Sequence, residues 1–172
     1  MRHAIGIALV SLFAAGCAGV QGVGTVATAK LAPASGSSVT GTVEFAHRGN
    51  MTILTAKVSG LTPGPHGFHI HEKGDCSAPD AMSAGGHFNP GGKKHGSPLV
   101  PDHHAGDLPM LAADAAGQAT LTTQIEGVTI GDGGPNDIVG RSVVIHKDAD
   151  DYSSQPAGNS GARVACGVIA KS

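Results

Sequence analysis

Aromatic residues and charge are scarce in this sequence, and each shortage argues against a class of function. Of 172 residues only 3% are aromatic and none is Trp, so a surface that stacks the bases of single-stranded nucleic acid is not expected. Only 14% are charged and the formal net charge is −2, so an extended basic face is not expected either. Hydrophobic residues reach 40%, which argues against disorder. We expect one folded domain that binds no nucleic acid.

The sequence also lacks an apolar run near its start that is long enough to span a membrane, which needs about 20 residues. The apolar run at 4–15 is shorter, and it follows a positively charged start, which is typical of a signal peptide at residues 1–16. Its end, Ala14-Ala15-Gly16-Cys17, resembles the lipobox of bacterial lipoproteins, in which the cysteine becomes the lipidated N-terminus. The alternative is an ordinary cleaved signal with an incidental cysteine nearby.

Lipidation of Cys17 would place the protein in the periplasm or cell envelope, with the membrane contacted only through that anchor. The small residues of 17–38 predict a flexible tether. A domain would follow at 39–172, or from residue 23 if the first candidate strand belongs to it. Cysteine is scarce, with three in all, and Cys76 and Cys166 remain for one disulfide in an oxidising compartment. The alternative is two free buried thiols.

Long helical periodicity and internal repeats are missing as well. Short alternating runs are separated by turn residues, and the chain has 27 Gly and 10 Pro. The candidate strands are 23–31, 39–45, 52–58, 66–71, 110–113, 119–125, 142–146 and 163–170. They predict an all-β antiparallel sandwich or barrel. Two long segments, 72–109 and 147–162, interrupt the pattern, and loops of this length are usually functional or tied down.

Histidine, in contrast, is abundant, with 10 His against 11 Lys plus Arg. His69 and His71 alternate on one candidate strand and face the same side, and His146 ends another strand. Burying two neighbouring imidazoles in a core costs free energy unless the polar nitrogens of both have partners, and a metal ion bound to both provides them. The segment 72–109 adds His87, His95, His104 and Asp107. Nitrogen-rich ligation suits Cu(II), whereas three His and one Asp suit a tetrahedral zinc site.

These residues lie in motifs that resemble the copper/zinc superoxide dismutase family. The motifs are GFHIHE at 67–72, GGHFNP at 85–90, KHG at 94–96, HAGDL at 104–108, HKDADD at 146–151 and RVACGV at 163–168. They follow one another in order over essentially the whole chain after the signal segment. Gly74-Asp75-Cys76, together with the lipobox, is similar to the exported bacterial branch of the family.

The resemblance implies an eight-stranded antiparallel Greek-key β-barrel with long metal-binding and electrostatic loops, and one copper and one zinc ion per chain. It implies that copper is held by His69, His71, His87 and His146, and zinc by His87, His95, His104 and Asp107. It also implies a pairing of Cys76 with Cys166.

The activity implied is the conversion of superoxide into dioxygen and hydrogen peroxide through Cu(II)/Cu(I) cycling. His87 would bridge the metals, Asp150 would accept hydrogen bonds from one ligand of each metal, and Arg163 would attract the superoxide anion. Lys93, Lys94 and Lys147 are candidates for the outer part of a positive funnel.

Two other functions compete with this enzyme. A non-catalytic periplasmic copper/zinc-binding protein on the same fold would need neither Arg163 nor Asp150. A tethered β-sandwich interaction module would leave two complete ligand sets unexplained. The resemblance leaves a monomer and a homodimer both open.

Three histidines after the signal segment receive no ligand role. We expect His47 to be exposed and His66 to be a structural hydrogen-bonding residue. His103 neighbours His104, but only His104 has the family's spacing to Gly106-Asp107.

Overall fold

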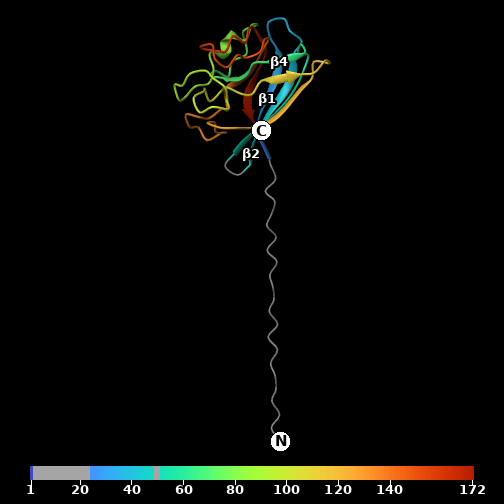
Figure 1. The fold of residues 1–172 in the computed structure, drawn as a ribbon. Coiled ribbons are helices and arrows are strands. Elements are labelled where there is room, and N and C mark those ends of the chain that lie inside the picture. The colour runs from blue at the N-terminus through green and yellow to red at the C-terminus, as the bar shows by residue number, and fades with distance from the viewer. Residues whose placement is uncertain (2–23, 49–50) are drawn as a thin grey trace.

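A computed structural model describes Met1 and residues 24–48 and 51–172 (Figure 1). The strands are β1 (Gly24–Pro33), β2 (Thr40–Arg48), β3 (Met51–Ser59), β4 (Gly64–His66), β5 (Phe68–His71), β6 (Leu111–Ala113), β7 (Ala119–Ile125), β8 (Ser142–His146) and β9 (Arg163–Lys171). Within these residues the helical element is a single 3₁₀ turn, η1 (Met82–Ala84). No helix in the described part of the chain is long and apolar enough to cross a membrane.

The strands form an antiparallel barrel from a curled sheet and a separate pair of strands. Seven of them make one curled sheet in the order β5-β8-β9-β1-β2-β3-β7, and β4 pairs with β6. The chain runs from β4 into β5 at one edge of the seven-stranded sheet, and β6 contacts β7 at the other, so the β4–β6 pair joins the two edges. The predicted all-β Greek-key fold is confirmed.

The single strand expected at 66–71 is divided at Gly67 into β4 and β5, and this corrects the prediction. The Gly67 N–H donates to Asp148 O, and its carbonyl accepts from the N–H of His146. A Cβ at this position would lie 2.7 Å from Ser160 Oγ, so glycine allows the loop after β8 to approach. If β4 and β5 are counted as one bent strand, the described residues contain the predicted eight strands.

The flexible tether predicted at 17–38 is wrong from residue 24 onward. β1 occupies Gly24–Pro33 and pairs with both β2 and β9, because its alternate residues Ala27 and Ala29 are fully buried in the core. The domain boundary near residue 23 agrees with this strand. The signal peptide predicted at 1–16, beyond Met1, and Cys17 lie outside the described residues.

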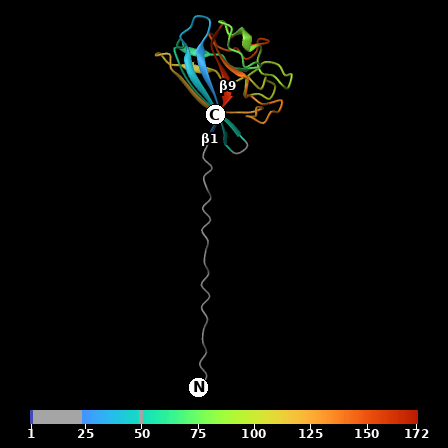
Figure 2. The same ribbon diagram turned by 180° about the vertical axis from the view of Figure 1, so that it is seen from behind.

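The pattern of buried residues differs between the strands, and the strands that carry the candidate ligands are buried along their whole length. On β3 the residues alternate, so that Leu54 and Ala56 face a core that also contains Val43 and Phe45. On β5 and β8, by contrast, every residue is buried. The long loops collect on one side of the barrel in both views (Figures 1 and 2), and the loop that follows β5 pairs with that strand at His69 and His71.

Candidate metal centre

Backbone pairing places the loop that follows β5 alongside that strand. His71 pairs with His87 and His69 with Asp107 in isolated β-bridges. The carbonyl of Ile70, which lies between the two histidines, accepts a hydrogen bond of 2.8 Å from Phe88 N. Because β5 pairs with β8, His146 at the end of β8 lies across from the same strand.

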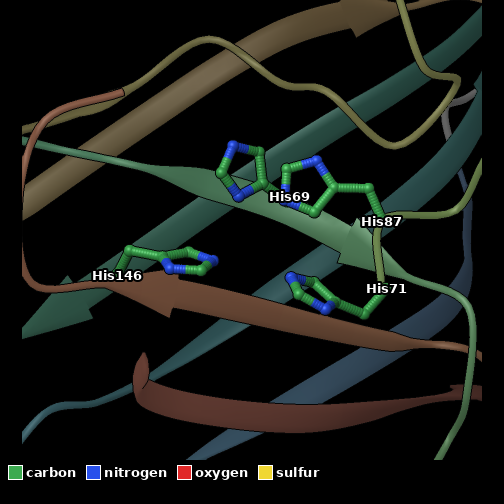
Figure 3. A group of neighbouring side chains, drawn as sticks. All are labelled: His69, His71, His87 and His146. Atoms are coloured by element: carbon green, nitrogen blue, oxygen red, sulfur yellow. The ribbon is translucent and has the colours of Figure 1, made fainter. Parts of the chain in front are cut away.

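The first group consists of four histidines whose rings point toward one another (Figure 3). Each offers one ring nitrogen that lies within 4.8 Å of those of the other three: His69, His71, His87 and His146. His69 Nδ1 and the Nε2 atoms of the other three are buried and have no hydrogen-bond partner. A buried polar atom without a partner costs about 1–3 kcal/mol, so four in one place indicate a shared ligand. The chemistry of four imidazole nitrogens fits copper.

The opposite ring nitrogens of three of these histidines are fixed by oxygen acceptors. His69 Nε2 donates to Asp150 Oδ2 at 2.6 Å, and His71 Nδ1 donates to Gly85 O at 3.0 Å. His146 Nδ1 lies 3.3 Å from Gly161 O. These contacts set the tautomer of each ring, so that the remaining nitrogen turns its lone pair toward the others.

The second group consists of His87, His95, His104 and Asp107, and it shares His87 with the first. Asp107 Oδ1 lies 2.9 Å, 3.0 Å and 3.3 Å from the Nδ1 atoms of His87, His95 and His104. The Nδ1 atoms of His87 and His104 are 3.4 Å apart. A tetrahedral zinc site with Zn–N bonds of about 2.0–2.1 Å has ligand-to-ligand edges of about 3.3–3.4 Å, so this group fits zinc.

His87 belongs to both groups through its two ring nitrogens. Its Nδ1 contacts Asp107 in the second group, and its buried Nε2 faces the first group. His87, predicted to bridge two metals, is the one residue that the two groups share.

Asp150 connects the two groups from the loop after β8. Its side chain is 1% exposed, and it accepts hydrogen bonds from His69 Nε2 at 2.6 Å and from His95 Nε2 at 2.9 Å. Burial alone would raise its pKa, but the hydrogen bonds from His69, the Tyr152 N–H and His95 lower the pKa below its usual value. Asp150 therefore remains an anion that orients one histidine of each group.

Burial keeps the four imidazoles of the first group neutral. It lowers the pKa of His87 to about 4 and that of His146 to about 3, and it lowers the pKa of His69 and His71 as well. For Asp107, hydrogen bonds from His104, His87 and Gly96 N outweigh the opposing effect of burial and hold its pKa well below the usual range. Neutral imidazoles and an ionised carboxylate are the states that bind metal ions at neutral pH.

Arg163, the first residue of β9, lies beside the first group. Its Nη1 donates to Ala81 O at 2.8 Å and its Nη2 to Gly85 O at 2.7 Å. The Gly85 carbonyl also accepts from His71, so one peptide oxygen connects the guanidinium to a candidate ligand.

The lysines suggested for a positive funnel receive less support. Lys93 Nζ donates to Pro101 O, and Lys93 and Lys147 line two separate cavities of about 830 Å³ and about 390 Å³. Lys94 is exposed.

The three histidines without a ligand role are placed as expected. His47 is exposed on β2. His66 is buried, with its ring nitrogens 2.9 Å from His146 O and 2.8 Å from Thr62 O. His103 Nδ1 contacts His104 O and takes no part in either group.

The disulfide between Cys76 and Cys166 is confirmed, with an S–S distance of 2.00 Å. It attaches the loop that carries His87 to β9. Two further loop contacts carry no signal in the sequence, because each joins residues that are far apart along the chain. Gln155 binds the main chain of His95, and the Tyr152 hydroxyl accepts from Met110 N at 3.0 Å.

Comparison with known proteins agrees with this geometry. The sequence pattern of the copper/zinc superoxide dismutase family matches residues 39–169. The chain is 47% identical over 142 residues to superoxide dismutase [Cu-Zn] 2 of Brassica juncea, which covers 78% of this chain and 91% of that protein. It is similar to the crystal structure of a double mutant of a SOD-like protein from Bacillus subtilis, with a TM-score of 0.72 and 39% identity, covering 81% of this chain and 94% of that one. The chain therefore belongs to the copper/zinc superoxide dismutase family of enzymes.

Proposed function

We propose that this protein is a superoxide dismutase that carries one copper and one zinc ion per chain and converts superoxide into dioxygen and hydrogen peroxide. The first group would hold copper, and the second group would hold zinc. The observation that carries the proposal is the set of four buried, unpartnered histidine nitrogens next to Arg163, with His87 shared by both groups. Copper in the first group would supply one-electron redox chemistry between Cu(II) and Cu(I).

The protein's own residues would perform three tasks in this reaction. The positive charge of Arg163 attracts the superoxide anion to the first group. Since Nδ1 of His87 lies against Asp107, Nε2 is the ring nitrogen placed to hold a proton and deliver it to the product. The other three residues of the second group, His95, His104 and Asp107, would hold zinc together with His87 and so fix the orientation of its ring; zinc would supply geometry and no redox chemistry.

The alternative is a non-catalytic copper/zinc-binding protein on the same fold. The test is metal analysis of the purified mature protein together with a dismutation assay. One copper and one zinc per chain with activity would support the enzyme, whereas both metals without activity would favour the alternative. Replacement of His87 by Ala should disturb both metals, and loss of only one metal would contradict its bridging role.

We also propose that the protein is an exported bacterial lipoprotein, anchored in the cell envelope through Cys17. The support is the lipobox-like sequence at 14–17 after a short apolar run. A homodimer is the alternative to a monomer, and sedimentation equilibrium of the mature domain distinguishes the two.

A further inference from the structure

His95, a member of the second group, lies outside the isolated β-bridges that include His87 and Asp107. It lies between Phe88 and Leu111, in a stretch without a named strand or helix. Its ring is fully buried, with Nδ1 3.0 Å from Asp107 Oδ1 and Nε2 2.9 Å from Asp150 Oδ1. These contacts orient the ring, but they do not fix the main chain from which the ring projects.

The main chain of His95 is held by the side chain of Gln155. The His95 N–H donates to Gln155 Oε1 at 2.9 Å, and Gln155 Nε2 donates to His95 O at 2.9 Å. This pair of bonds satisfies both peptide groups of one residue, as a neighbouring β-strand would. Gln155 Nε2 also donates to Ser153 O at 3.2 Å, which keeps the amide in the required orientation.

We propose that Gln155 is a positioning residue for zinc binding: it fixes the main chain of His95 so that Nδ1 points at the other ligands of the second group. Gln155 lies 60 positions away in sequence, on the loop that also carries Asp150. The two residues therefore hold His95 at both ends, Gln155 at the backbone and Asp150 at the far ring nitrogen. The inference rests on the proposed zinc site.

The chemistry of the amide is specific. A glutamine supplies one acceptor and one donor, which match the N–H and C=O of His95. Gln155→Ala removes both bonds. Gln155→Glu keeps the acceptor but places a second carboxylate oxygen against the His95 carbonyl, and the side chain keeps its size. A purely space-filling role would tolerate the second variant, whereas a positioning role would tolerate neither.

The experiment compares the zinc dissociation constants of the full mature protein and its variants, measured by competition with a chromogenic zinc chelator. Contacts that orient a ligand typically change metal affinity by about 10–100-fold, so we expect about tenfold weaker zinc binding in Gln155→Ala and at least as much in Gln155→Glu. Copper affinity should stay unchanged, whereas the melting temperature of metal-free Gln155→Ala should fall, because the buried His95 N–H and C=O lose their partners. The control is Gln124→Ala, an exposed glutamine on β7.

Zinc affinity within twofold of the unsubstituted protein in both variants would overturn the proposal. So would a fall in metal-free melting temperature without a change in zinc affinity, because that result is a general structural effect. His95→Ala separates this proposal from the zinc assignment on which it rests. If zinc affinity survives that substitution, the assignment itself fails; if only the Gln155 variants leave affinity unchanged, the assignment stands and the positioning role fails.

Discussion

At the scale of single residues, the centre depends on close approaches that only glycine allows. Gly158 has φ 65°, and a Cβ there would overlap Asp150 Oδ1 and lie 2.6 Å from His95 Nε2. The hydrogen bond that connects Asp150 to the second group therefore requires the absence of a side chain at this position. No spacing of histidines in the sequence reveals such a requirement.

Gly158→Ala should weaken zinc binding by about tenfold, because the methyl group displaces Asp150 from His95. It should also lower the free energy of unfolding by about 1 kcal/mol, because alanine disfavours this φ. Gly36→Ala is the matched control: Gly36 has φ 73°, and a Cβ there would meet no atom within 4 Å. Chelator competition checks the affinity, and equal zinc binding by the two variants would contradict the steric argument.

Burial lowers the pKa of the Arg163 guanidinium, and the negative charge of Asp80 opposes this shift, so Asp80 should also influence how strongly Arg163 attracts an anion. Asp80→Asn keeps the Oδ1 that accepts from Met82 N and removes only the charge. We expect kcat/KM for superoxide to rise by about twofold at low ionic strength and the gain to vanish in high salt. Asp114→Asn is the control, because Asp114 Oδ1 likewise accepts backbone hydrogen bonds, in the turn before β7. An equal rise in the control would show a general charge effect.

At the scale of elements, most strands follow from hydrophobic alternation, because one face of each lies in the core. The observed β3, β7 and β8 differ from the candidate strands by at most one residue at either end. The break at Gly67 could not be predicted, because the backbone bonds of Gly67 join it to Asp148 and His146, which are distant in sequence. The small residues of β1 suit both a strand and a flexible tether, so the sequence predicts both. The pairing of β1 with β9 decides for the strand.

Only part of the candidate site could be predicted from strand geometry. The histidines on β5 and β8 follow from strand geometry, whereas the choice of His104 over His103 depended on resemblance to a family. The contacts of Gln155 were not predictable, because they form between two irregular loops 60 residues apart.

The disulfide joins the loop before His87 to β9, and it packs with Ala34, Ala81, Ala84 and Val144. Its sequence separation of 90 predicts a loss of about 4–5 kcal/mol in the free energy of unfolding when it is removed, by the chain-entropy model. Because Ala81 O accepts from Arg163, reduction should also lower activity. Denaturant unfolding of the Cys76→Ser/Cys166→Ser double variant measures the loss. A reductant should destabilise the unsubstituted protein and leave this variant unchanged; the opposite result would contradict the prediction.

At the scale of the whole molecule, the chain enters the barrel far from the metal groups. β1 begins at Gly24, and Ala27 pairs with Lys171 at the last residues of β9, whereas Arg163 is the first residue of that strand. A strand rises about 3.3 Å per residue, so the eight steps from Arg163 to Lys171 span about 26 Å. A lipid at Cys17 would therefore attach the domain by the end that is opposite to Arg163, and anchoring would leave the approach to the first group open.

This separation allows anchoring and activity to be tested independently. Cys17→Ser should move the protein from the membrane fraction to the soluble fraction, because a lipidated cysteine is the only anchor proposed. The soluble variant should keep the kcat/KM of the anchored protein after detergent extraction, since the start of β1 lies far from Arg163. Fractionation with quantitative immunodetection, followed by the dismutation assay, measures both. Gln21→Ser, which keeps Cys17, should remain in the membrane fraction. If Cys17→Ser also remains there, the lipid anchor is wrong, whereas a soluble variant with lost activity would show that the anchor and the metal groups are coupled.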